Sequence, residues 1–312
     1  MLGTAFPAGR LLLVEQPGPW GRLGLLQSHF DPLMADRLVR SCDAAGVRVL
    51  AIRRPGRSPD GAPRRWAWVD AGLGRERMGW GSYRDERDLW GQAAAFLRGA
   101  IPGAAGAAGD KDSAAGAVDG GAVDGDAAQS GAAQGGAPSY LVCAHGSHDA
   151  CCAVRGRPVA AALTRLRPDD VWECSHVGGD RFAANVLVVP SGVLYGAIRV
   201  DELPALVAAT DRGDALASPL RGKIGLAPEA QAALAGAHAQ WGGPLSGYRV
   251  LSVGPRIGNL VTVRLQQRRP MGDRTADVDV RVTRSDVHRL TCHMTTPSRV
   301  SNYQPESMSP VS

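Results

Sequence analysis

Lysine is nearly absent from this chain of 312 residues, because Lys111 and Lys223 are the only lysines among 35 basic residues. The formal charge is only +5, and the arginines are scattered among 30 acidic residues. Nucleic-acid binding calls for a clustered basic face or a recognised binding module. We therefore expect no nucleic-acid partner.

Targeting segments and membrane spans are also missing from the sequence. Residues 1–13 lack the basic start, continuous apolar stretch and small-residue cleavage site of a signal peptide. No apolar run reaches the roughly eighteen residues that a membrane helix requires. These absences predict a soluble, cytoplasmic protein with no membrane partner.

Familiar catalytic motifs do not occur either. The sequence has no Walker A motif, no HExxH, no GxSxG, and no GxGxxG placed between a strand and a helix. Scattered acids such as Glu15 and Asp31 do not establish the facing carboxylate pair that sugar hydrolysis requires. No common class of enzyme is indicated.

Glycine, by contrast, is abundant, with 40 residues, and many of them lie in one segment. Residues 103–137 consist almost entirely of Gly, Ala, Asp, Ser and Gln, with too little apolar bulk to offset the entropy of ordering. We predict a flexible linker at 103–138. It separates an N-terminal domain, residues 1–102, from the rest of the chain.

The N-terminal domain has the pattern of a small α/β layer. Apolar periodicity and turn residues predict the order strand, helix, strand, strand, helix. These elements are expected at 10–16, 32–45, 47–53, 65–70 and 84–97.

The segment 139–215 has the element order of a thioredoxin-like module. We predict a strand, a helix and a strand, then a hairpin and a closing helix, at 139–144, 151–166, 170–175, 186–189, 193–199 and 202–210. Residues 216–312 are predicted to form an extension with a helix at 228–241 and strands at 249–253, 260–265 and 278–282. Its tail, from Thr296, is expected to be frayed.

The cysteines are distributed unevenly along the chain. In a reducing compartment they are better read as ligands, reactive thiols or core residues than as a disulfide framework. Four of the six lie between 143 and 174, the full set being Cys42, Cys143, Cys151, Cys152, Cys174 and Cys292.

Two loops of the thioredoxin-like segment hold the residues that can carry chemistry. The first, CAHGSHDACC at 143–152, runs from a strand end to a helix start, where backbone amides and the helix dipole favour a thiolate. The second, CSHVGGDR at 174–181, offers His176 and Asp180 beside two glycines that let the backbone wrap closely. Because parallel strands end at the same sheet edge, we expect these loops to meet in a redox or metal site.

Several longer stretches resemble the sucrase/ferredoxin-like family, which belongs to the thioredoxin-like [2Fe-2S] ferredoxins. In those ferredoxins two cysteines of the first loop and a C-x3-C pair of the second hold the cluster, and characterised relatives of this family use H-x3-H as the second pair. Carried over by position, the resemblance implies Cys143, Cys152, His176 and Asp180 as ligands. The similar stretches are EQPGPWG at 15–21, RVLAIRRPGR at 48–57, CAHGSHDACCAVRGRPVAAAL at 143–163 and SHVGGDRFAANVLVVPSGVLYG at 175–196.

Asp180 departs from the two-histidine pattern. A carboxylate is a harder ligand than imidazole or thiolate, so it could complete the site or leave the fourth position to Cys151, Cys174 or solvent. Arg181 could also pair with Asp180 and hold it away from a metal.

Other residues near the loops have structural alternatives. Cys174 and Cys42 are expected in the core, and Asp149 is expected to cap the following helix. His145 and His148 could donate hydrogen bonds to a cluster or could simply be solvated loop residues.

These observations predict an electron-transfer or redox-sensing protein that carries a [2Fe-2S] cluster, a non-catalytic electron carrier rather than an enzyme. Its partner would be a redox protein that donates or accepts the electron. Two alternatives remain at this point. One is a cluster-free thiol protein using Cys151 or Cys152, and the other is an interaction module that is stapled by zinc or free of metal.

Overall fold

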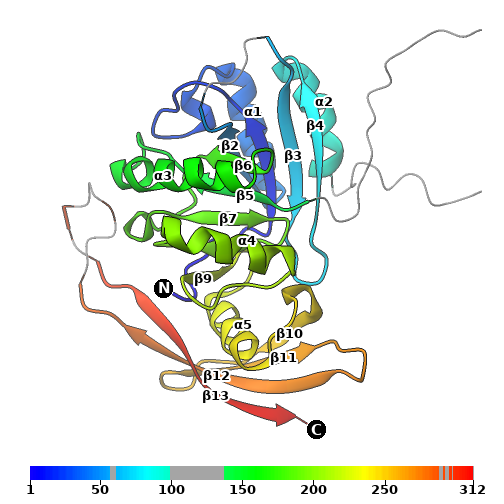
Figure 1. Cartoon of the computed structure of the whole chain (residues 1–312), viewed down its shortest axis with the longest axis vertical. Helices are drawn as coiled ribbons and strands as arrows, with labels where there is room; N and C mark the ends of the chain where they lie inside the picture. Colours follow the sequence, from blue (N-terminus) through cyan, green and yellow to red (C-terminus); the bar gives the residue numbers. More distant parts are fainter. Residues whose placement is uncertain (57–60, 99–136, 288–290, 292–294, 297, 312) are drawn as a thin grey trace, which may run out of the picture.

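The computed structural model describes residues 1–56, 61–98, 137–287, 291, 295, 296 and 298–311. It is a mixed α/β structure with a nine-stranded mixed sheet and a separate four-stranded antiparallel sheet (Figure 1). The predicted α/β class is therefore confirmed. The predicted linker at 103–138 lies outside the described residues, apart from its last two.

Residues 10–97, which we call the first unit, build one side of the large sheet. Strand β1 lies between a parallel β2 and an antiparallel β3, and β4 follows β3 at the edge. Asp31 caps α1 by accepting a hydrogen bond from the Met34 backbone N–H at 2.8 Å. The elements are β1 (Arg10–Glu15), α1 (Pro32–Ala44), β2 (Val47–Arg53), β3 (Arg64–Asp70), β4 (Arg77–Tyr83) and α2 (Glu86–Leu97).

Residues 139–211, the second unit, repeat this arrangement. Strand β5 lies between a parallel β6 and an antiparallel β7, and β8 follows β7. The elements are β5 (Ser139–Cys143), α3 (Ala150–Leu166), β6 (Val171–Cys174), β7 (Val186–Val189), β8 (Val193–Tyr195) and α4 (Leu203–Asp211). Both units thus have the same order of strands and helices.

The two units join through their corresponding edge strands. β2 pairs with β6 in antiparallel fashion, with Ile52 opposite Cys174 and Arg53 opposite Glu173. One sheet therefore spans both units, in the order β4-β3-β1-β2-β6-β5-β7-β8-β9, where β9 is Leu220–Lys223. The division into domains at 1–102, 139–215 and 216–312 remains a prediction.

Strand alternation assigns the apolar residues of the large sheet to different cores. Leu12 and Val14 pack beneath α1 and α2, whereas Leu11 and Leu13 share a core with Leu141 of the second unit. Strands that are buried on both faces need a continuous apolar run, which is the pattern of LLLV in β1. This core, on one face of the joined sheet, includes residues of both units and extends to Cys143, Cys152 and Cys174.

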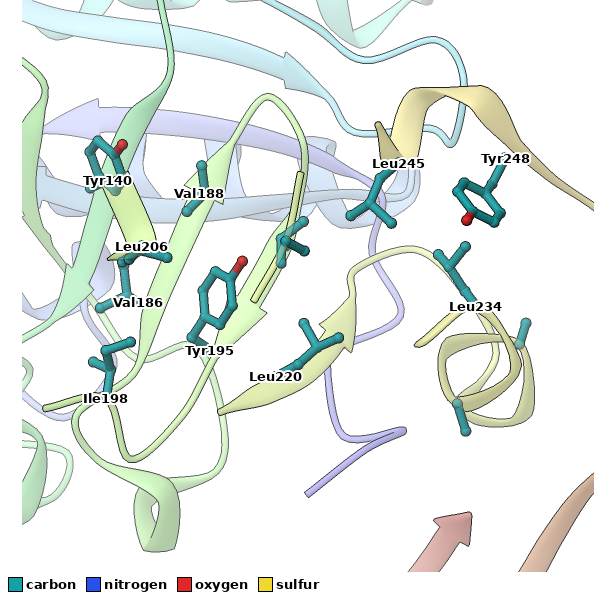
Figure 2. Packing of buried hydrophobic residues seen from close by; sticks show 14 of the residues in the cluster. Tyr140, Val186, Val188, Tyr195, Ile198, Leu206, Leu220, Leu234, Leu245 and Tyr248 are labelled. Atoms are coloured by element: carbon teal, nitrogen blue, oxygen red, sulfur yellow. The ribbon is translucent and has the colours of Figure 1, made fainter. Parts of the chain in front are cut away.

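A third core connects the second unit to the C-terminal part of the chain. Figure 2 shows Tyr195 of β8 near Leu220 of β9, with Leu234 of α5 and Leu245 beyond. The antiparallel sheet packs on the same helix, α5. The elements of this part are α5 (Pro228–Trp241), β10 (Tyr248–Val253), β11 (Leu260–Gln267), β12 (Arg274–Arg284) and β13 (Ser301–Val311).

The expectation of a frayed tail from Thr296 was wrong, because β13 pairs with β12 along most of its length. Tyr303 and Met308 pack against the core at α5, which gives this polar strand an apolar side. Pro305 and Pro310 are compatible with it because β13 is the edge strand of its sheet.

Strand β4 was missed because its sequence, RMGWGSY, contains two glycines. Gly79 packs against Trp68 on β3, where a Cβ would lie 2.5 Å from the indole Nε1. Gly81 packs in the same way against Trp66. The glycines make room for two large side chains on the neighbouring strand, a use of glycine that local propensity does not reveal.

Within the part of the chain that the structure describes, none of the helices combines the length and the apolar character needed to cross a bilayer.

Candidate metal centre

Cys143 is the last residue of β5, and its position is set by close packing of α3 against the strand. Its thiol is buried, and its backbone lies beside Cys174 in the parallel pair of β5 and β6. A Cβ at Gly156 of α3 would overlap the carbonyl oxygen of Cys143. Gly156 therefore allows the helix to approach the strand end that carries the first thiol.

Cys152 lies in the first turn of α3. Asp149 caps this helix by accepting a hydrogen bond from the Cys151 backbone N–H at 2.8 Å, as predicted. The neighbouring cysteines diverge, because Cys152 is fully buried whereas Cys151 is half-buried and disulfide-bonded. Cys151 therefore departs from the expectation that the cysteines are ligands, reactive thiols or core residues.

His176 and Asp180 lie on the loop after β6. Gly178 and Gly179 have φ angles of 79° and 74°, in the left-handed region that favours glycine, and they turn the chain back toward α3. The His176 Nδ1 lies 3.0 Å from the Asp180 Oδ1, although this buried nitrogen has no hydrogen bond of acceptable geometry. The side chain of His176 is 18% exposed and that of Asp180 only 4%, so the imidazole is the outer group.

The two loops meet, as the strand ends predict. Ligand atoms of Cys143, Cys152 and His176 all lie within 4.8 Å of one another. Asp180 joins the group through Cys152, whose Sγ is 3.6 Å from the Asp180 Oδ1.

A second group of possible ligands overlaps with the first. His148, His176 and Asp180 also have ligand atoms within 4.8 Å of one another, and the rings of His148 and His176 stack with centroids 3.8 Å apart. The sequence suggested His148 only as a hydrogen-bond donor or a solvated residue. Its position two residues before the helix start was the available signal.

His145 ties the first unit to this site. Its Nε2 lies 2.8 Å from the carbonyl oxygen of Gly21, and its Nδ1 accepts a hydrogen bond from the His176 backbone N–H at 3.1 Å. Since Nδ1 is the acceptor, Nε2 carries the proton. Burial lowers the pKa of His145, which agrees with a neutral ring that positions the loop.

Two arginines, the partly buried Arg48 and the buried Arg221, hold the His176 loop. Arg48 of β2 donates a hydrogen bond to the carbonyl oxygen of His176 at 2.9 Å, and Arg221 of β9 donates to that of Gly178 at 2.8 Å. Burial lowers the pKa of both guanidinium groups, that of Arg221 to about 10. The negative charge of the Cys143 thiolate raises the pKa of each arginine and so opposes the effect of burial. Neither arginine was expected at the site, because a strand arginine has no local signal for burial.

The electrostatics of the site favour a thiolate at Cys143. A hydrogen bond from Cys152 lowers the pKa of Cys143 well below its ordinary value, against the opposing effect of burial and with the help of His176. The hydrogen bond with Cys143 and burial both raise the pKa of Cys152. For His176, burial lowers the pKa, but interactions with Asp180 and Cys143 outweigh it and raise the value to about 9.

Arg181 does not oppose the participation of Asp180. Its guanidinium lies over the ring of Phe182, 4.4 Å from the centroid. Among the described residues no ion pair joins Arg181 to Asp180. The fourth predicted residue thus points toward Cys152 and His176.

Comparison with known proteins shows a similarity over part of the chain. Residues 91–222 match the model of the sucrase/ferredoxin-like family. This segment is similar to that family. The sucrase/ferredoxin-like segment contains all four predicted site residues and extends to Arg221, whereas the similar stretches at 15–21 and 48–57 precede it. No curated protein and no solved structure matches the chain.

Proposed function

We propose that the second unit is a thioredoxin-like ferredoxin module and that Cys143, Cys152, His176 and Asp180 bind a [2Fe-2S] cluster. The protein would then serve in electron transfer or redox sensing, with a redox protein as donor or acceptor. Neither a nucleic acid nor a membrane is the proposed partner, and the cytoplasm is the proposed compartment. The strand order β6-β5-β7-β8, with α3 and α4, supports the thioredoxin-like assignment.

The observation that carries this proposal is the convergence of two buried thiols and one imidazole within 4.8 Å. Thiolate and imidazole are the donors that iron–sulfur centres use, so the residues present suit such a group. The buried Nδ1 of His176 lies 3.0 Å from the Asp180 Oδ1 without a hydrogen bond of acceptable geometry, and we propose it as the imidazole donor atom. When bound, the cluster would supply a one-electron redox couple.

Positively charged residues next to the site support the binding of a negatively charged group. Thiolate ligands bring negative charge into a buried site, and burial of unpaired charge is costly. Arg48 and Arg221 place two guanidinium groups behind the His176 loop. We propose that they stabilise the negative charge of the loaded site while His176, the outer ligand, faces the electron partner.

Zinc is the second candidate, favoured by the compactness of the site. Three donor atoms within 4.8 Å, with a carboxylate next to them, also suit one tetrahedral ion. A cluster-free thiol function has less support, because Cys151 is disulfide-bonded and Cys152 is a buried thiol with a raised pKa.

The test is a chemical analysis of the whole chain purified without oxygen. We expect a brown protein with equal amounts of iron and acid-labile sulfide, and a visible spectrum that bleaches with dithionite. A protein that contains zinc but no acid-labile sulfide would favour a structural zinc site over the cluster. Colourless protein that lacks iron and sulfide after anaerobic reconstitution would overturn the proposal.

A further inference from the structure

The segments around the metal centre are predominantly basic. Three segments meet there, residues 16–31, 144–168 and 175–199; their acids are Asp31, which caps α1, and the buried Asp149 and Asp180. Several arginines of the same segments reach solvent. We call the resulting surface the site face, defined by Arg22, Leu23, Val154, Arg155, Arg157 and Arg181.

Contacts between the three segments bring them together around the site. The His148 Nδ1 lies 3.3 Å from the carbonyl oxygen of Arg22, and Arg155 donates a hydrogen bond to the carbonyl oxygen of Ala183 at 3.4 Å. Arg181 directly follows Asp180 in sequence. The loop of the first unit, the start of α3 and the loop after β6 therefore form one rim around His176.

Apolar side chains interrupt the basic rim. Leu23 is 61% exposed and Val154 is 72% exposed. Large apolar side chains between like charges are typical of a surface that a protein covers, because a partner gains their burial in addition to charge pairing. A polyphosphate backbone would use the arginines but would leave the apolar side chains without a partner.

We propose that the site face docks a redox protein with an acidic surface, so that the electron passes through the exposed edge of His176. This inference rests on the function proposed above and adds the kind of partner. Complementary charge steers such a partner to the face and raises the association rate, while the exposed leucine and valine contribute to the docked complex.

The test compares the reactions of two small oxidants with the dithionite-reduced protein by stopped flow. One electron leaves the reduced centre and converts ferricyanide to ferrocyanide, or hexaamminecobalt(III) to the cobalt(II) ion. We expect the ferricyanide rate to fall about tenfold between about 0.01 M and about 0.3 M salt, because salt screens the attraction. The rate with the cobalt cation should rise over the same range.

Charge-reversal variants locate the effect. In the double variant Arg155→Glu, Arg157→Glu, the rates with ferricyanide and with the cobalt cation should lose most of their dependence on salt. The visible spectrum of this variant should not change. The matched control Arg212→Glu, Arg249→Glu reverses two exposed arginines elsewhere, one after α4 and one on β10, and should behave as wild type. Equal slopes in both double variants, or no salt dependence in the wild type, would overturn the docking proposal.

A competition experiment separates a protein partner from a nucleic acid. Poly-L-aspartate should slow ferricyanide oxidation of the wild type more than an oligothymidylate of equal charge. Equal inhibition by the two polymers would make the face a general polyanion site and contradict the proposal. Absence of any dithionite-reducible centre would instead refute the proposed function, so the two failures are distinguishable.

Discussion

The first and second units have the same order of strands and helices, but only the second has a thiol at the end of its first strand. β1 ends in Glu15, whereas β5 ends in Cys143. The loop after β1 runs through residues 16–31, much longer than the loop at 144–149 that follows β5. The same arrangement of elements thus ends in two different loops.

This difference assigns separate tasks to the two units. The short loop of the second unit brings its cysteines together, while the long loop of the first unit lies over them. Gly21 and Arg22 of that loop contact His145 and His148. Trp20 adds an edge-to-face contact with His145 at a centroid distance of 5.9 Å. One unit supplies the donors and the other encloses them.

Removal of thiols should give the largest difference between the units. Cys143→Ala and Cys152→Ala should each lower bound iron and sulfide by at least about tenfold, because each variant removes a thiolate that would bind the cluster directly. Cys42→Ala, in the core of the first unit, should keep both and cost about 1–2 kcal/mol of unfolding free energy through the cavity that it leaves. Metal and sulfide analysis with urea unfolding measures both effects. Iron retained in both site variants would contradict the ligand assignment.

A pair of helix glycines offers a matched comparison of packing. A Cβ at Gly156 of α3 would overlap the Cys143 carbonyl oxygen, whereas one at Gly91 of α2 meets no atom within 4 Å. Overpacking costs about 1–3 kcal/mol, and alanine gains about 1 kcal/mol over glycine in a helix. Because the overlap at Gly156 is with backbone, we expect the upper end of that cost, so Gly156→Ala should lower the unfolding free energy by about 2 kcal/mol. Gly91→Ala should raise it by up to about 1 kcal/mol.

Thermal and urea unfolding of the two glycine variants provide the measurement. Iron content should fall in Gly156→Ala only, because that glycine places the strand end with the first thiol. Equal stability of both variants would show that α3 can shift without cost, and the close packing of α3 against β5 would then have no role in the site.

Much of the fold was predictable because the strands have clear periodicity. The β7 range, Val186–Val189, was predicted to the residue, and α3 was predicted within one residue of its start. The equivalence of the units was not visible, because the glycines of β4 hid the fourth strand of the first unit. The pairing of β2 with β6 depends on contacts between distant segments, which local patterns do not encode.

The sequence could predict those residues of the candidate site that lie at the ends of strands and helices. Cys143, Cys152 and His176 follow from loops that must share a sheet edge. Arg48 and Arg221 lie within strands, where side-chain direction and burial depend on the neighbouring unit. Gly21 covers the site through its backbone carbonyl, which no residue type signals.

Substitutions of Asp180 should have the smallest effect of these variants and test the fourth proposed ligand of the second unit. If its carboxylate is a ligand, Asp180→Ala should lower the iron content several-fold, while Asp180→His should retain iron and shift the visible spectrum, because imidazole is the softer donor. Asp180→Asn keeps an oxygen near His176 but removes the charge, so it separates ligation from positioning of the imidazole. Wild-type iron content and spectra in the alanine and histidine variants would remove Asp180 from the ligand set and leave His148 as an alternative donor.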